Sequence, residues 1–129
     1  MTDPEKTALG FRDGKALAAW FQVNHATADE LWVRVHKKAT GHPSVDWDDC
    51  VRVCLAWGWI DGLKRSGGED IWYQRLTPRR ARSNWSARNM NIATRLIAEG
   101  KMQRPGLKQV SLALQDGRWK GPMPVGSER

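Results

Sequence analysis

The fold is decided by residues 59–78, which read WIDGLKRSGGEDIWYQRLTP. Two segments rich in apolar residues, Trp59–Lys64 and Ile71–Leu76, flank the stretch Ser66–Asp70, which contains two consecutive glycines. Segments of this kind on either side of a glycine-containing turn predict two antiparallel strands joined as a hairpin. Pro78 has no backbone N–H to donate to a neighbouring strand, so we expect the second strand to stop at this proline.

Upstream of the hairpin, the hydrophobic periodicity predicts one further strand and two helices. Apolar and polar residues alternate through Leu31–Lys38, which is typical of a strand with one buried face. The segment Lys15–Val23 carries apolar residues at helical spacing, and Asp13 is its expected N-cap. The second helix has Cys50 and Cys54 on one face, and we expect both to be buried thiols of the core.

Capping residues and glycines delimit this second helix and two further helices. The expected limits are Ser44 or Asp46 to Gly58, Ser83 or Ser86 to about Glu99, and near Pro105 to Gly117. The result is an α+β fold with about four helices packed on a small antiparallel sheet of about three strands. We expect a single domain over residues 11–119, a flexible N-terminus over residues 1–10 and a disordered tail over residues 120–129.

Composition narrows the class of protein. The chain has 129 residues, a formal net charge of +7 and eight tryptophans. Its 40% of hydrophobic and 27% of charged residues exclude a disordered or disulfide-rich secreted protein. No apolar stretch approaches the roughly 20 residues needed to span a bilayer, so we expect no membrane span. The first residues contain no apolar segment of a secretory signal, so we expect a cytoplasmic protein.

Positive charge is concentrated in the second half of the chain. Residues 71–129 contain twelve Lys and Arg but three Asp and Glu. Residues 71–98 contain no carboxylate and six arginines, whose planar guanidinium groups suit phosphate or carboxylate better than lysine does. These are Arg75, Arg79, Arg80, Arg82, Arg88 and Arg95. The run is either a solvated basic face or a binding site for an anion.

We expect the anion site at the junction between the last strand and the next helix. A helix N-terminus exposes backbone N–H groups and carries partial positive charge, which together attract anions. The candidate anion-binding residues are Arg75, Thr77, Arg79, Arg80, Arg82, Ser83, Ser86, Arg88 and Asn89. The candidate stacking or cleft residues are Trp59, Asp61, Trp72 and Trp85. The alternative is that the serines only cap the helix and that Trp85 belongs to the core.

Asp61 is the one acidic residue near this junction. It either forms a structural ion pair with Arg75 across the hairpin or faces the cleft as a base or hydrogen-bond acceptor. The sequence contains no catalytic triad, no set of zinc ligands and no phosphate-loop motif, so we expect neither a metal nor a cofactor. As loop residues, Arg79 and Arg80 are expected to be dispensable for folding.

Several ordered motifs resemble a known family. They are ELWVRVHKKATG (30–41), GWIDG (58–62), RLTPRR (75–80), SNWSARN (83–89), EGKM (99–102) and DGRW (116–119). They are similar to motifs of the YdeI/OmpD-associated family of bacteria, also called bacteriocin-protection proteins. The resemblance implies a stress-response role, with tolerance to antimicrobial peptides and a protein partner at an outer-membrane porin. It also implies that any shared site lies among Asp61, Arg75, Thr77, Arg79, Ser83, Trp85, Ser86 and Asn89.

Three functions are compatible with these observations. The favoured one is a cytoplasmic module that binds an anionic partner, either nucleic acid or a phosphorylated small molecule. The second is protection from stress or antimicrobial peptides through a protein partner, although a chain of net charge +7 repels cationic peptides. The third is an enzyme acting on an anionic substrate, with Asp61 as acid or base.

Overall fold

Four strands form one sheet in the order β1-β2-β4-β3, in a computed structural model that describes residues 3–121. They are β1 (Leu9–Gly10), β2 (Leu31–His36), β3 (Trp59–Ser66) and β4 (Ile71–Pro78). The β3–β4 hairpin and the β2 strand confirm the periodicity-based predictions, and β2, β4 and β3 are antiparallel. The sheet differs from the expected three antiparallel strands by its fourth strand, β1, which pairs with β2 in parallel.

The N-terminal segment adds to the sheet. Residues 4–10, predicted to belong to a flexible N-terminus, instead form the short helix α1 (Pro4–Thr7) and β1. Between them, Ala8 is buried against Trp32 and Tyr73, on the face of the sheet opposite the helices α2 and α3. Residues of a two-residue strand carry too little periodicity to be found by pattern, so only tertiary packing identifies them. Of the predicted tail, only Lys120 and Gly121 lie within the described residues.

The helices begin at the predicted caps. Helix α2 (Gly14–Asn24) is capped by Asp13, whose Oδ1 accepts from the Ala16 N–H at 2.9 Å. Helix α3 (Trp47–Ala56) is capped by Asp46, not Ser44, through a reciprocal capping box with Asp49. Helix α4 (Ala87–Ala98) is capped by Ser86, and α5 (Arg104–Gln115) has its proline in the first turn. A short 3-10 turn, η1 (Lys38–Thr40), ends the segment predicted as strand up to Lys38.

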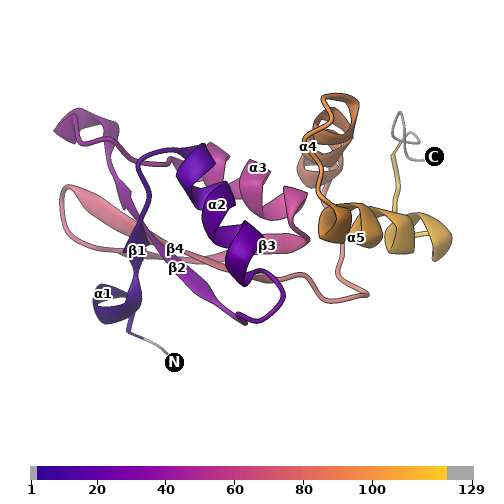
Figure 1. The fold of residues 1–129 in the computed structure, drawn as a ribbon, viewed down its shortest axis with the longest axis horizontal. Coiled ribbons are helices and arrows are strands. Elements are labelled where there is room, and N and C mark those ends of the chain that lie inside the picture. The colour runs from indigo at the N-terminus through magenta and orange to yellow at the C-terminus, as the bar shows by residue number, and fades with distance from the viewer. Residues whose placement is uncertain (1–2, 122–129) are drawn as a thin grey trace.

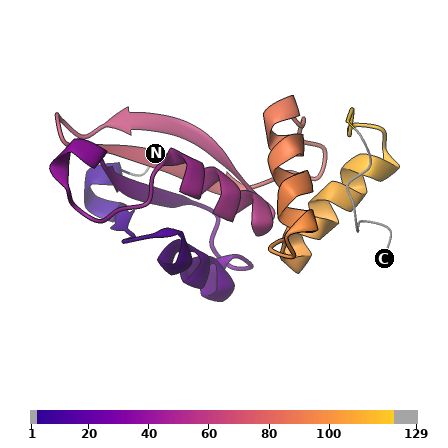
Figure 2. The same cartoon turned by 90° about the horizontal axis from the view of Figure 1, so that it is seen from above.

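Helices α2 and α3 cover one face of the sheet, and α4 and α5 lie beyond its end (Figure 1, Figure 2). The core between α2, α3 and the sheet is built around Phe21 and Trp59, whose rings meet edge to face with centroids 5.0 Å apart. Cys50 and Cys54 are free, buried thiols of the same core, as predicted. Burial raises the pKa of the Cys50 thiol to about 12.

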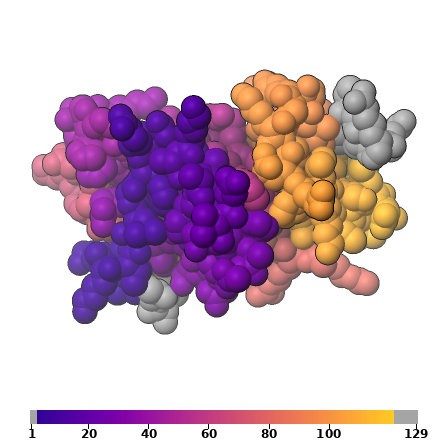
Figure 3. Space-filling view, viewed as in Figure 1, coloured from indigo at the N-terminus to yellow at the C-terminus, as the bar shows by residue number. Residues whose placement is uncertain are grey.

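Helix α3 also belongs to a second core, which joins the sheet to the C-terminal helices. Val51 and Leu55 pack there against Met90, Ala93 and other residues of α4, α5 and their flanks. Helix α5 approaches α3 so closely that a Cβ on Gly106 would lie within 2.7 Å of the Leu55 carbonyl oxygen. The C-terminal helices therefore form a distinct end of an elongated molecule (Figure 3).

A bulge in β3 positions the residues around Asp61. The register between β3 and β4 shifts between Asp61 and Lys64. The fully buried Gln74 side chain compensates, because its Nε2 donates to the carbonyl oxygens of Gly62 at 3.0 Å and Leu63 at 3.3 Å. A buried amide that satisfies otherwise unpaired carbonyls fixes the bulge in one conformation.

Candidate anion-binding site

The loop between β4 and α4, residues 79–86, contains most of the predicted site, and we call it the arginine loop. Its start is fixed by a hydrogen bond from the Arg79 N–H to the carbonyl oxygen of Gly58 at 3.0 Å. Its end is fixed by Ser86, whose hydroxyl accepts from the Asn89 N–H at 3.1 Å. Ser86 thus has the capping role that the sequence left open as an alternative.

Arg79 points into the protein rather than into solvent. Its side chain is buried, and its guanidinium lies over Trp85 with the Cζ atom 3.9 Å from the ring centroid. Nη1 donates to the Ser83 hydroxyl at 2.8 Å and to the Asn84 carbonyl at 3.0 Å. Burial lowers the pKa of Arg79 to about 10. The sequence predicted a solvated loop side chain at this position, whereas Arg79 is buried, so we now expect its replacement to affect folding.

The Arg79 guanidinium has unfilled bonding capacity. Its Nε and Nη2 atoms are buried and have no hydrogen-bond partner among the described residues. Nearby, Arg118 donates through Nη1 to the Ser83 carbonyl and through Nε to Asp116 at 2.7 Å. Arg118 has no place in the predicted site, and only the tertiary structure brings it to the arginine loop.

Two other predicted arginines are paired with acids. Arg75 Nε bonds to Glu30 Oε1 at 2.7 Å, and the same oxygen accepts from the Trp32 indole N–H. Arg88 Nη2 lies 3.6 Å from Asp61 Oδ1. The predicted Asp61–Arg75 pair is therefore wrong. Asp61 lies opposite Leu76, on the face of the sheet that α3 covers, whereas Arg75 lies on the other face.

The tryptophans predicted as stacking residues are largely covered by other side chains of the protein. Trp59 is 1% exposed and Trp85 is 7% exposed, and Trp85 packs against Trp119 with ring centroids 5.1 Å apart. Trp72 is partly buried against the core, beneath the ammonium of Lys64. The reading of Trp85 as a core residue is the one the structure supports.

A second set of aromatic contacts involves Trp47, a residue outside the predicted site. Trp47 lies beneath two cations, with Lys64 Nζ at 4.9 Å and Arg88 Cζ at 4.6 Å from its ring centroid. Helical spacing within α3 gives no sign of the cations that β3 and α4 contribute to this contact. With Asp61, these residues form a charged cluster beside the N-terminus of α4.

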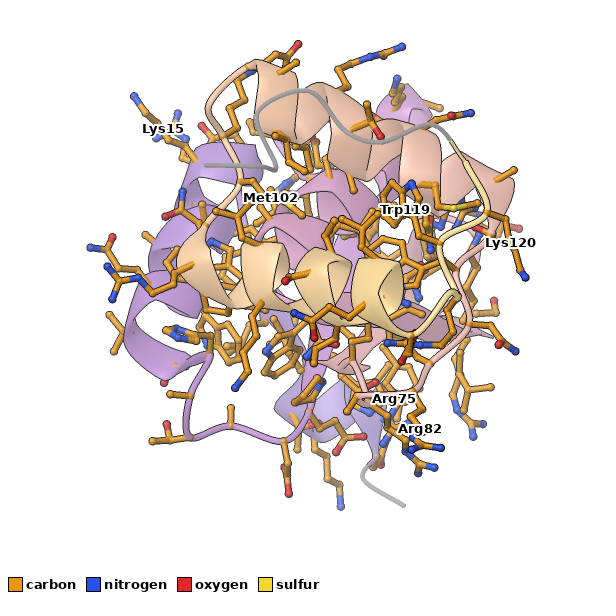
Figure 4. All side chains as sticks on the ribbon, turned by 90° about the vertical axis from the view of Figure 1, so that its right-hand side faces the viewer. Lys15, Arg75, Arg82, Met102, Trp119 and Lys120 are labelled. Carbon is orange, nitrogen blue, oxygen red and sulfur yellow. The ribbon has the colours of Figure 1, made fainter. Side chains whose placement is uncertain are left out.

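The six arginines therefore do not share one hollow. Thr77 is partly buried on β4, and Asn89 is buried and accepts from Arg88. Within residues 3–121, Arg80 and Arg82 are exposed and have no ion pair. Figure 4 shows Arg82 pointing outward, whereas Trp119 lies between α4 and α5. Among the predicted site residues, Arg80 and Arg82 combine an exposed guanidinium with the absence of an ion pair, whereas Arg88 is exposed but lies beside Asp61.

Positive charge is concentrated at one end of the molecule, in the segment that follows the sheet. Residues 79–121, which we call the basic end, contain ten Lys and Arg against two Asp and Glu. The preceding 78 residues contain ten Lys and Arg against eleven Asp and Glu. The near-neutral part is the sheet with α1, α2 and α3, and the positive part is the arginine loop with α4 and α5. The electrostatic field of the basic end attracts anions over a distance, before any contact forms.

Residues 3–121 contain no cluster of three or more His, Cys, Asp or Glu that could hold a metal ion. No helix in the same part of the chain is long and apolar enough to cross a membrane.

A family model described as a domain of unknown function, DUF8412, matches residues 9–109. This match covers most of the chain, which therefore belongs to that family. No curated protein and no solved structure matches it.

Proposed function

We propose that this protein binds nucleic acid through phosphate contacts made by the basic end. The observation that carries the proposal is the charge of this end, together with the exposure of Arg80 and Arg82. Exposed arginines that form no ion pair are available to release counterions from a polyphosphate chain, which is the main source of such affinity. The proposal places the protein in the cytoplasm.

The distribution of cations on the basic end suits an extended polyanion better than a small phosphorylated molecule. The exposed cations are spread over the arginine loop, α4 and α5, rather than gathered around one point. On α5, Arg104 and Lys108 are four residues apart and share one helix face. Spread cations match a repeating backbone charge, and they predict binding with little sequence preference.

The other two expected functions receive less support. The Asp61 carboxylate pairs with Arg88, which makes it a poor candidate for an acid or base. The role at a porin that the resemblance to YdeI/OmpD-associated proteins implies remains the alternative, with tolerance to antimicrobial peptides as its phenotype.

The test compares two variants with the same change of charge. Arg80→Ala/Arg82→Ala removes the exposed pair of the arginine loop, and Lys6→Ala/Lys15→Ala removes two exposed cations outside the basic end. Binding of labelled single-stranded and duplex oligonucleotides is followed by fluorescence anisotropy over a range of salt concentrations. We expect the slope of log K against log salt for duplex DNA to fall by about two in the first variant.

The control variant should keep the slope of the wild-type protein. Equal losses in both variants would mean that net charge alone matters and would contradict an interface at the basic end. Absence of binding at the lowest salt concentration would exclude nucleic acid as the partner. An intact circular dichroism spectrum in each variant shows that the comparison concerns folded protein.

A further inference from the structure

A second basic site lies where β1 meets β2, far from the arginine loop. A pocket of about 410 Å³ is lined there by Phe11, Arg12, Arg34, His36 and His42, and we call it the histidine pocket. Its ionisable lining residues are two arginines and two histidines, without a carboxylate among them. The adjacent turn η1 and the helix α5 lie at opposite ends of the molecule (Figure 1).

The backbone of Ala8 and of the adjacent strand β1 holds Arg34 in place. Arg34 pairs with Gly10 in the β1–β2 register, and its Nη2 donates to the Ala8 carbonyl oxygen at 3.1 Å. A Cβ on Gly10 would lie 3.4 Å from Nη1, so the glycine leaves room for the guanidinium beside the strand. Within residues 3–121, neither Arg34 nor Arg12 forms an ion pair. The pocket thus holds two guanidinium groups without a counter-charge.

The two histidines stack on each other. The rings of His36 and His42 have centroids 3.9 Å apart and planes inclined by 15°. The His42 Nδ1 atom lies 2.9 Å from the Pro43 carbonyl oxygen, which marks it as the donor nitrogen and leaves Nε2 for another partner. Desolvation, His42 and Arg34 lower the pKa of His36, and Asp70 opposes them. A second positive charge in this stack is therefore unfavourable without an anion.

We propose that the histidine pocket binds a small molecule bearing a phosphate group. Arg12 and Arg34 supply fixed positive charge, and His36 and His42 add hydrogen-bond donors when they are protonated. Phe11 offers an apolar wall to the organic part of the ligand, and the volume suits a small molecule. A metal ion fits poorly, because the two guanidinium groups repel a cation from the imidazoles.

The chain contains three histidines, which makes NMR a direct test. His25 contacts Trp57, outside the pocket, and serves as the internal reference. The probes are inorganic phosphate at neutral pH and inorganic sulfate over a pH range, because sulfate keeps its charge throughout. We expect saturable shifts of the His36 and His42 imidazole signals only. Sulfate should bind more tightly at lower pH, because protonated imidazoles add positive charge and hydrogen-bond donors to the pocket.

Variants separate the pocket from general charge effects. Arg12→Ala removes an exposed guanidinium of the pocket, and Lys108→Ala removes one exposed charge on α5. We expect the first to weaken phosphate binding about tenfold, the loss of one charge-assisted hydrogen bond, and the second to leave it unchanged. Linear shifts without saturation, equal shifts of His25, or equal losses in both variants would overturn the proposal.

The test also distinguishes this site from the nucleic-acid surface. Arg80→Ala/Arg82→Ala leaves the histidine pocket intact and should bind phosphate with wild-type affinity. Loss of the histidine shifts in this variant would mean that phosphate binds at the basic end and would contradict the pocket. Loss of oligonucleotide binding with retained histidine shifts would support two separate anion sites.

Discussion

The Cζ atom of Arg79 lies 3.9 Å from the centroid of the Trp85 ring, and both side chains are almost completely buried. Trp85 belongs to the core of α4 and α5, and the Arg79 N–H donates to the carbonyl oxygen of Gly58, which directly precedes β3. A charge at such a position costs desolvation energy, which the contact with the indole ring partly offsets. Arg79 therefore joins the sheet to the basic end.

Two replacements of Arg79 should separate the contribution of its packing to the free energy of unfolding from the desolvation cost of its charge. Arg79→Ala removes the bonds to Ser83 and Asn84 and the cover over Trp85. We expect it to lower the free energy of unfolding by about 2–4 kcal/mol. Arg79→Met keeps most of the volume without the charge and should lie within about 1 kcal/mol of the wild-type protein. Urea unfolding followed by tryptophan fluorescence measures both.

Arg80→Ala is the matched control, because Arg80 is exposed in the same loop. It should change stability by less than about 0.5 kcal/mol. Wild-type stability in Arg79→Ala would show that the arginine does not hold the loop.

The buried thiols should make the protein sensitive to alkaline pH. The folded protein holds the pKa of Cys50 at about 12 against an ordinary value of 9.0, and the pKa of Cys54 is also raised by burial. The unfolded chain loses these protons first, so the contribution of the thiols is full below about pH 9 and is lost as the pH rises toward the folded value. Each thiol adds a slope of at most about 1.4 kcal/mol per pH unit.

Urea unfolding at several alkaline pH values measures this slope in the wild-type protein and in Cys50→Ala/Cys54→Ala. The double variant should be less stable at neutral pH, because it leaves cavities in the core, but it should lose less stability as the pH rises. Identical pH slopes would contradict the assignment. The native thiols should also react slowly with a thiol reagent until the protein unfolds.

The close contact between α5 and α3 predicts that Gly106 accepts no side chain. In Gly106→Ala the new Cβ would overlap the carbonyl oxygens of Ala56 and Leu55, which are backbone atoms and cannot rotate away. We expect a loss of about 1–3 kcal/mol, seen as a lower midpoint in thermal unfolding. Ser111→Ala, at an exposed position of the same helix, should leave the midpoint nearly unchanged. A tolerated Gly106→Ala would contradict the close packing.

Much of the fold could be predicted because its signals are local. The alternation in Leu31–His36, the turn before Ile71, and the caps Asp13 and Asp46 each act within a few residues. The parallel strand β1 could not be predicted, because two residues have no period and their pairing depends on a partner more than twenty residues away.

The candidate site was harder to predict from the sequence. Charge and residue type identified the arginine-rich segment, but neither specifies which guanidinium is buried, paired or exposed. The register of the sheet and the placement of α4 bring Arg75 to Glu30 and Arg88 to Asp61, where they form ion pairs. The turn η1 brings His36, at the end of β2, into contact with His42, which follows the turn.

The sequence by itself determined the mixed helix and strand content, the buried cysteines and the excess of positive charge after residue 79, since these depend on composition and short-range spacing. Only the tertiary structure decided that Arg79 is a core residue, that Arg80 and Arg82 stay exposed and that two histidines share a pocket with two arginines. The physical reason is that burial and ion pairing depend on segments distant along the chain, whose approach no local pattern encodes.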